Sequence, residues 1–244
     1  MINIYENKLK VSASMCDVNV QMGLLQSMQV AQDNMCEYYK NIGCDGLTMA
    51  PICNCFFVVS KIKIHFQKYL SWLDEFSTIS ELVELSRIKM SLETEFKDKA
   101  GSVFATCVHQ MCAMDSDTRA LRAVNTTLVP TDLETTKSTP IQFTKFNAEM
   151  TDENYVKTIS IELPNVDFYR HTNNVEYVRL ILSCLDVDFM DNYFISDFEI
   201  HYLAESKFGE KLALYKKVLG DEIFFEIRRE DKVINKSVMK VIKR

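Results

Sequence analysis

Two short stretches of this chain bring together residue types that can attack a carbonyl group. Asp167 and His171 lie four residues apart, and Asn173 and Asn174 follow them directly before an amphipathic run. An acid and a histidine beside the free N–H groups of a helix N-terminus form a place to hold and attack a carbonyl. Further along the chain, Glu205 supplies a second carboxylate. The pattern predicts a hydrolytic site that acts on an acyl group.

A helix is expected directly after the Asn pair. Apolar residues recur at helical spacing over about 173–186, which is typical of a half-buried helix. Thr172 or Asn173 can cap its first turn. The amides of that turn would then face the reacting group, where they can polarise its carbonyl oxygen.

Glu205 and Ser206 follow a strand expected over about 193–204. Phe198 and Ile200 mark the apolar face of that strand, so strict alternation places Glu205 on the other face. A β-bulge at the end of the strand would re-aim it. Ser206 can hydrogen-bond with Glu205, but no neighbour in the sequence activates it as a nucleophile.

The chain contains two copies of one pattern. Residues 58–66 line up with residues 194–202 at an offset of 136, and residues 17–21 line up with residues 167–171 at an offset of 150. Self-similarity on this scale indicates duplicated domains. The second copy alone keeps the titratable side chains: the first has Gln21, Tyr69 and Leu70 in place of His171, Glu205 and Ser206. We therefore expect catalysis in the C-terminal copy.

Both copies predict one helix and several antiparallel strands, which is an α+β fold. The helical stripe of the first copy begins at Leu24 and ends at Gly43, a natural helix stop. A stretch rich in Thr, Ser and Pro separates the copies, so we expect an N-terminal domain over 1–128, a linker over 129–148 and a C-terminal domain over 149–244. The predicted strands cover about 55–67, 76–87, 89–97, 102–114, 154–162, 193–204, 210–219, 222–229 and 233–242.

Composition restricts the class of protein. A net charge of −6 argues against a nucleic-acid partner, which would be met by a basic surface. Only Cys53 and Cys55 are closely spaced, with one residue between them, so we expect free thiols and neither a metal site nor a cofactor. Apolar runs reach nowhere near the ~18 residues of a membrane span, and the N-terminus lacks a signal-peptide profile. We therefore expect a cytoplasmic protein.

The region from Glu205 to the end of the chain carries eleven basic and seven acidic residues. Two interpretations stay open for this local excess of positive charge. It can form a basic face for an acidic partner, or it can reflect strands with ordinary solvated charges.

The residues around His171 and Glu205 resemble the motifs of the acyl-acyl carrier protein thioesterases of plants and bacteria. That family carries Asp-x-Asn-x-His-x-Asn-Asn and then a Tyr-x-x-Glu-Cys box. The helix after Asp17 and the strand through Phe57 to Ser60 also resemble that family's substrate-pocket domain, so the resemblance covers nearly the whole chain. The matching residues are Asp167-Phe168-Tyr169-Arg170-His171-Thr172-Asn173-Asn174 and Tyr202-Leu203-Ala204-Glu205-Ser206.

The resemblance implies two tandem hot-dog domains, each a long central helix wrapped by an antiparallel sheet. It also implies hydrolysis of the thioester that joins a fatty acyl chain to the phosphopantetheine arm of acyl carrier protein (ACP), which is the expected partner. Two fused domains already form a pseudo-dimer, so both a monomer and a homodimer are compatible with the sequence. The candidate catalytic residues are then Asp167, His171 and Glu205, and the candidate substrate-binding residues are Tyr169, Asn173, Asn174 and Ser206.

Two positions depart from the family pattern, because the family's Asn falls on Tyr169 and its Cys falls on Ser206. A phenol and an alcohol differ from an amide and a thiol in geometry and acidity. We therefore expect water to attack the thioester, activated by Glu205 or by Asp167. An acyl-coenzyme A thioesterase and a non-catalytic acyl-binding protein are the alternative functions. Five residues are candidates either for the wall of an acyl tunnel or for ordinary core packing: Met22, Met28, Met35, Phe56 and Phe57.

Overall fold

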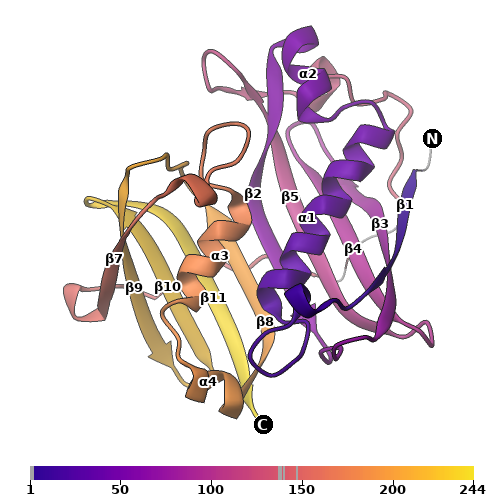
Figure 1. Cartoon of the computed structure of the whole chain (residues 1–244). Helices are drawn as coiled ribbons and strands as arrows, with labels where there is room; N and C mark the ends of the chain where they lie inside the picture. The colour runs from indigo at the N-terminus through magenta and orange to yellow at the C-terminus, as the bar shows by residue number, and fades with distance from the viewer. Residues whose placement is uncertain (1–2, 137–138, 140, 147) are drawn as a thin grey trace.

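A single antiparallel sheet with helices on one face makes up most of the computed structural model (Figure 1). The structure describes residues 3–136, 139, 141–146 and 148–244. The helices are α1 (Leu24–Asn41), α2 (Gly46–Cys53), α3 (Asn174–Leu182) and α4 (Val187–Asn192). The strands are β1 (Ile4–Lys10), β2 (Cys55–Phe66), β3 (Glu75–Leu85), β4 (Met90–Asp98), β5 (Val103–Asp115), β6 (Leu121–Arg122), β7 (Tyr155–Ser160), β8 (Tyr193–Tyr202), β9 (Lys211–Leu219), β10 (Glu222–Arg229) and β11 (Lys232–Lys243).

The sheet consists of two equivalent halves. Its order is β1-β3-β4-β5-β2-β8-β11-β10-β9-β7. Counted outward from the centre, β2, β5, β4, β3 and β1 of one half correspond to β8, β11, β10, β9 and β7 of the other. The halves meet where β2 pairs with β8, and Lys63 lies opposite Glu199 in that register. These two residues are also equivalent at the sequence offset of 136. An approximate two-fold axis therefore passes through the Lys63–Glu199 pair.

Helix α1 packs its apolar side against the sheet of the N-terminal half and ends at the expected glycine. Gly43 has a φ of +73°, a conformation that other residues adopt only with strain. Its N–H bonds the carbonyl of Lys40 at 3.0 Å, and the next N–H bonds the carbonyl of Tyr39 at 3.0 Å. This is the Schellman arrangement, which satisfies the last carbonyls of a helix.

The apolar core forms two clusters on the helix-bearing side of the sheet. The larger cluster spans both halves and includes Met22 and Met28 under α1 as well as Val178 and Ile181 of α3. The second cluster lies in the N-terminal half, against the end of α1 and beneath α2. It is rich in methionine: its members include Met35, Met49, Met90 and Met111.

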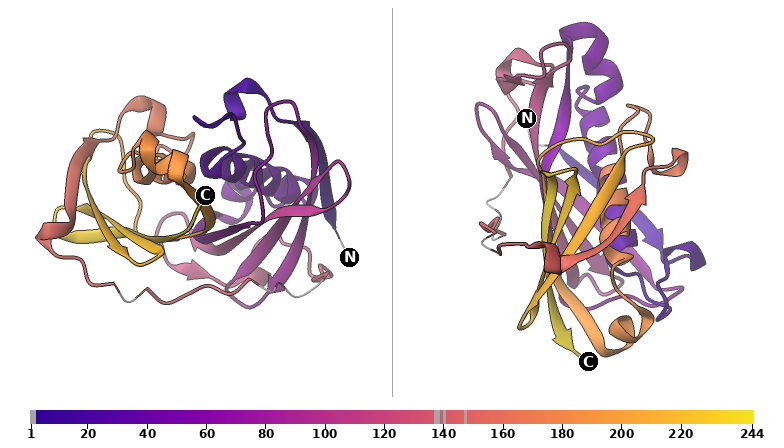
Figure 2. Two further views of the ribbon diagram at one scale, coloured as in Figure 1. Left: turned by 90° about the horizontal axis from the view of Figure 1, so that it is seen from below. Right: turned by 90° about the vertical axis from the view of Figure 1, so that its left-hand side faces the viewer.

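The opposite face of the sheet is polar at its centre and is covered by part of the connection between the halves (Figure 2). Glu199 is buried there, 3.0 Å from Lys63 Nζ and 2.8 Å from His201 Nε2. The backbone N–H of Thr144 donates to Glu199 at 2.7 Å, and the ring of Phe146 lies 4.2 Å from that of His201. A buried charge cluster therefore joins β2, β8 and the connecting segment 141–146.

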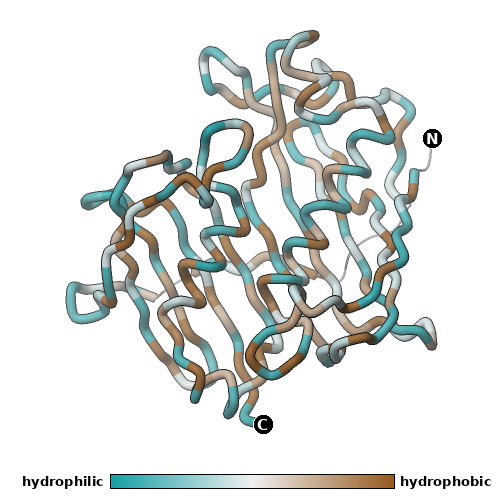
Figure 3. Tube along the Cα trace, in the orientation of Figure 1, coloured by the Kyte–Doolittle hydropathy of each residue, from teal (hydrophilic) through white to brown (hydrophobic). Residues whose placement is uncertain are grey.

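The structure confirms the predicted strands, whose ends differ from the observed ones by two residues or fewer. The alternating hydropathy that predicted them is visible along the strands in Figure 3. Among the described residues, no helix has both the length and the apolar character to cross a bilayer.

The expected helix over 173–186 is shorter than predicted. Helix α3 ends at Leu182, and α4 starts after Asp186, whose carboxylate accepts a hydrogen bond from the N–H of Phe189 at 2.7 Å. An aspartate in this capping position favours a new helix start over continuation. The elements β1 and α2 were not predicted at all.

Candidate active site

The loop that carries Asp167 and His171 is a tight turn closed by one carboxylate. Asp167 Oδ1 accepts hydrogen bonds from the N–H of Tyr169 at 2.9 Å and of His171 at 3.3 Å. The N–H of Asp167 donates to the carbonyl of His171 at 2.9 Å, and Arg170 has a φ of +64°. The Asp167 carboxylate therefore determines the shape of the turn that presents His171.

The same turn exists in the N-terminal half, where the titratable set is missing. Asp17 Oδ1 accepts from the N–H of Asn19 at 2.8 Å and of Gln21 at 3.2 Å, and Val20 has a φ of +60°. Gln21 takes the place of His171 in this copy. An aspartate therefore forms this turn whether or not a histidine follows it. The turn by itself is a sufficient structural reason for Asp167.

A bulge turns Glu205 toward His171. After the end of β8, the N–H groups of both Leu203 and Ala204 donate to one carbonyl, that of Ile234, at 2.9 and 3.1 Å. Two donors on one acceptor break the alternation of the strand. The β-bulge expected at the end of this strand is therefore present. Glu205 Oε2 consequently lies 3.3 Å from His171 Nε2, with the two side chains 35% and 20% exposed, respectively.

Ser206 is buried and connects the two loops of the site. Its Oγ lies 2.7 Å from both Thr172 Oγ1 and Tyr177 Oη, and its carbonyl accepts the N–H of Thr172 at 2.8 Å. The equivalent N–H in the first copy, that of Met22, bonds the carbonyl of Leu70 at 2.8 Å. Ser206 thus holds Glu205 beside the His171 loop, and its hydroxyl has no exposed surface.

The Asn pair begins α3, but its two members play different parts. Asn173 caps the helix, because its side chain accepts the N–H of Val175 at 2.9 Å and its own N–H bonds the carbonyl of Asn165 at 2.9 Å. It also lines a cleft of about 380 Å³ between α1 and α3, to which His171 and Glu205 do not contribute. Among the described residues, the N–H of Asn174 has no acceptor. Of the two amides expected to polarise a carbonyl, only that of Asn174 is free.

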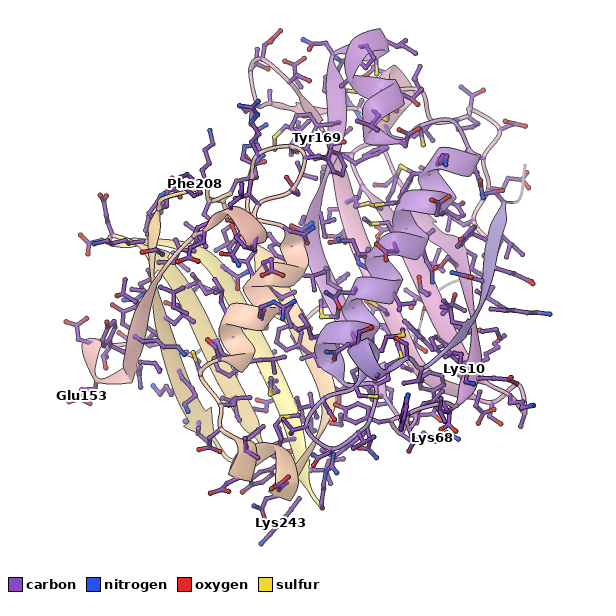
Figure 4. The ribbon with its side chains drawn as sticks, in the orientation of Figure 1. Lys10, Lys68, Glu153, Tyr169, Phe208 and Lys243 are labelled. Atoms are coloured by element: carbon purple, nitrogen blue, oxygen red, sulfur yellow. The ribbon has the colours of Figure 1, made fainter. Side chains whose placement is uncertain are left out.

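Tyr169 reaches across to the N-terminal half, as Figure 4 shows at the border between the two halves. Its ring stacks on Phe56 with the centroids 5.9 Å apart. Its Oη fills the space beside Gly46, where an added Cβ would lie only 1.5 Å away. Burial, together with the nearby Cys36 and Asp45, raises the pKa of Tyr169 and keeps the phenol neutral. Tyr169 therefore fastens the His171 loop to the start of α2.

Sequence reasoning missed one charged residue of this site. Arg119 lies between β5 and β6 of the N-terminal half, and its guanidinium donates to Glu205 Oε2. The two residues are distant in the chain and belong to different copies, so no local pattern connects them.

Comparison with known proteins identifies one family. The model of the acyl-ACP thioesterase N-terminal domain matches residues 2–130, and that of the acyl-ACP thioesterase C-terminal domain matches residues 148–241. No curated protein sequence matches the chain.

Solved structures similar to nearly the whole chain include acyl-ACP thioesterases. An acyl-ACP thioesterase from Bacteroides thetaiotaomicron has a TM-score of 0.87 at 18% identity, with 98% of each chain covered. The 12:0-ACP thioesterase from Umbellularia californica has a TM-score of 0.84 at 15% identity, with 99% of this chain and 98% of that chain covered. Identities this low establish a shared fold, here two tandem hot-dog units. Because both domain models of the family match, the chain belongs to the acyl-ACP thioesterases and is a hydrolase of fatty acyl-ACP thioesters.

Proposed function

We propose that Glu205 activates water for attack on the acyl thioester, with His171 beside it and the N–H of Asn174 as a donor to the carbonyl oxygen. The observation that carries this proposal is the 3.3 Å contact between Glu205 Oε2 and His171 Nε2 next to the start of α3. Both side chains are partly exposed, so a substrate can reach them. A carboxylate near its reacting partner is a suitable general base.

The reaction then has two steps. Glu205 takes a proton from water as the water oxygen attacks the carbonyl carbon, and the negative charge that forms on the carbonyl oxygen is held by the N–H of Asn174. The tetrahedral intermediate collapses when the C–S bond breaks, and the proton passes to the departing pantetheine thiolate. The products are a free fatty acid and holo-ACP.

The other candidate residues support this pair without bonding to the reacting atoms. Asp167 shapes the turn, and Asn173 caps α3. Tyr169 and Ser206 anchor the two loops. In this proposal Asp167 is a positioning residue, because its Oδ1 is already engaged by two backbone N–H groups.

We expect Ser206→Ala to lower stability while most of the turnover is retained. The change removes a buried hydroxyl that bonds Thr172 and Tyr177, and such a loss costs about 1–3 kcal/mol. Urea unfolding measures the first effect and steady-state hydrolysis the second. Ser183→Ala is the control, since that hydroxyl bonds the carbonyl of Leu180 at the end of α3. A loss of kcat in the Ser206→Ala enzyme beyond about 1,000-fold would instead make Ser206 the nucleophile.

The two halves divide the work in this proposal. The domain over 149–244 carries the chemistry, the domain over 1–128 accepts the acyl chain, and residues 129–148 link them. The methionine-rich second cluster supports this division, because flexible methionines adapt to a lipid chain. Strand β2 joins the site to that cluster: Phe56 stacks on Tyr169, and the next residue, Phe57, packs against the cluster. Of the candidate tunnel residues, Met22 and Met28 pack in the larger cluster.

ACP, rather than coenzyme A, is the carrier in this proposal. Arg170 and Lys207 adjoin His171 and Ser206 in the chain, and both are exposed. Neither side chain has a hydrogen bond or ion pair with a described residue, so each can meet an acidic protein. A cytoplasmic location is part of the proposal, since the eight free cysteines suit a reducing compartment.

The test compares a panel of acyl-ACPs of different chain length with the matching acyl-coenzyme A compounds. Faster release of fatty acid from ACP, lost in His171→Ala, is the expected result. The double variant Arg170→Glu/Lys207→Glu should raise KM for acyl-ACP by a larger factor than KM for acyl-coenzyme A, because coenzyme A carries its negative charge only on the phosphates of its nucleotide end. Equal or faster cleavage of the coenzyme A esters would overturn the choice of carrier. Tight acyl binding without turnover would overturn the catalytic assignment.

A further inference from the structure

We propose that Arg119, supplied by the N-terminal half, positions the Glu205 carboxylate for catalysis in the C-terminal half. The inference rests on the proposed role of Glu205 as the base. The Arg119 guanidinium donates to Glu205 Oε2, the same oxygen that lies 3.3 Å from His171 Nε2. Among the described residues, Oε1 of Glu205 accepts no hydrogen bond. The ion pair thus fixes one carboxylate oxygen and leaves the other free to bind the attacking water.

The hairpin that carries Arg119 is built to hold this side chain in place. Asp115 Oδ1 accepts hydrogen bonds from the N–H of Asp117 at 3.2 Å and from both the N–H and the hydroxyl of Thr118 at 2.9 Å. The N–H of Arg119 donates to the carbonyl of Asp115 at 3.1 Å. Arg119 itself has a φ of +59°, so its backbone occupies a left-handed conformation that is unusual for a non-glycine residue.

The same hairpin is tied to the junction between α2 and β2. Asn54 Nδ2 donates to Asp117 Oδ2 at 2.6 Å, and the carbonyl of Asn54 accepts the N–H of Ser116 at 2.9 Å. Two residues further along β2, the ring of Phe56 lies beneath the guanidinium, with Arg119 Cζ 5.0 Å from the ring centroid. A cation over an aromatic face gains further attraction and loses rotational freedom.

Phe56 serves both halves of the site at once. Arg119 lies over this ring and Tyr169 stacks on it, so the residue that holds Glu205 and the residue that fastens the His171 loop share one support. The N-terminal half thereby locates both members of the catalytic pair relative to each other. This arrangement gives Arg119 a positioning function beyond that of a surface ion pair, whose contribution to stability alone is small.

The experiment measures kcat and KM on one acyl-ACP for five variants, each checked for folding by its thermal midpoint. The variants are Arg119→Gln, Arg119→Lys, Glu205→Gln, the Arg119→Gln/Glu205→Gln double variant and Arg87→Gln. Arg87 lies exposed in the turn between β3 and β4, so its variant controls for the loss of one positive charge.

Arg119→Gln should lower kcat by about 10- to 100-fold with little change in KM. Displacing a catalytic group slows the chemical step but leaves the binding of the substrate unchanged. Arg119→Lys should recover part of that loss, since it keeps the charge. In the Glu205→Gln background, removing Arg119 should cause no further loss, because the two residues act as one unit. Arg87→Gln should match the wild type.

Three results would overturn the proposal: wild-type kcat in Arg119→Gln, no recovery in folded Arg119→Lys, or an equal loss with and without Glu205. Failure of the proposed function looks different. In that case Glu205→Gln itself keeps turnover, whatever Arg119 does.

Discussion

Glu205→Gln is expected to lower kcat for acyl-ACP hydrolysis by about 100- to 10,000-fold, the usual contribution of a general base. Glutamine has the shape of glutamate, and its amide oxygen can still accept from Arg119, so the geometry of the site is retained. An amide cannot take a proton from water, however, so the chemical step is lost. Steady-state assays of fatty acid release measure the effect, with KM expected to change little.

A matched control separates the loss of the base from the loss of a local charge. Glu230 is exposed in the turn between β10 and β11, so Glu230→Gln removes one carboxylate without changing a residue of the site. Asp167→Asn should also keep most of its activity, because an amide oxygen can still close the turn. Near wild-type turnover in Glu205→Gln, or a larger loss in Asp167→Asn, would assign the role of base to Asp167.

Glu199→Ala is expected to lower the free energy of unfolding by about 3–5 kcal/mol, the typical result of breaking a buried ion pair. The Glu199 side chain is 2% exposed, and its removal leaves Lys63 and His201 without their partner. Burial by itself would raise the pKa of Glu199, but hydrogen bonds from His201, Thr144 and Lys63 outweigh burial and hold the pKa below its ordinary value. Its stabilising contribution is therefore present above the ordinary pKa of a glutamate and is lost as pH falls through the lowered pKa.

Urea unfolding of the wild type and the variant provides the measurement. Glu222→Ala, on the exposed start of β10, is the control and should change stability by less than about 0.5 kcal/mol. The double variant Lys63→Met/Glu199→Met should regain most of the lost stability, since apolar pairs replace buried ion pairs well. A Glu199→Ala protein within about 1 kcal/mol of the wild type would show that the cluster is not a stabilising element.

Much of the fold could be predicted because this chain repeats its pattern. Alternation along residues such as Ile62 and Ile64 identified the strands, and Gly43 ended α1 as expected. Strand β1 was missed because Glu6, Asn7, Lys8 and Lys10 make up more than half of it, and these residue types have low strand propensity. The repeat carried a signal for it, since Tyr5 and Leu9 align with Tyr155 and Ile159 of β7 at the offset of 150.

The site was predictable only where its residues stand in recognisable sequence motifs. The contact of His171 with Glu205 followed from two motifs and one bulge. The buried position of Ser206 did not, because its partner Tyr177 projects from the middle of α3. No pattern in the sequence pointed to Arg119, since this residue contacts Glu205 only because β2 pairs with β8.

The unlike charges at the centre of the sheet also dictate which halves can join. Two C-terminal halves paired through β8 would bury Glu199 against its own copy, and two N-terminal halves paired through β2 would oppose Lys63 with Lys63. Both homotypic unions bury like charges, whereas the heterotypic union buries a salt bridge. Produced as separate polypeptides, the halves should therefore select each other and reject themselves. The covalent connection between the halves therefore joins two surfaces whose central charges are complementary.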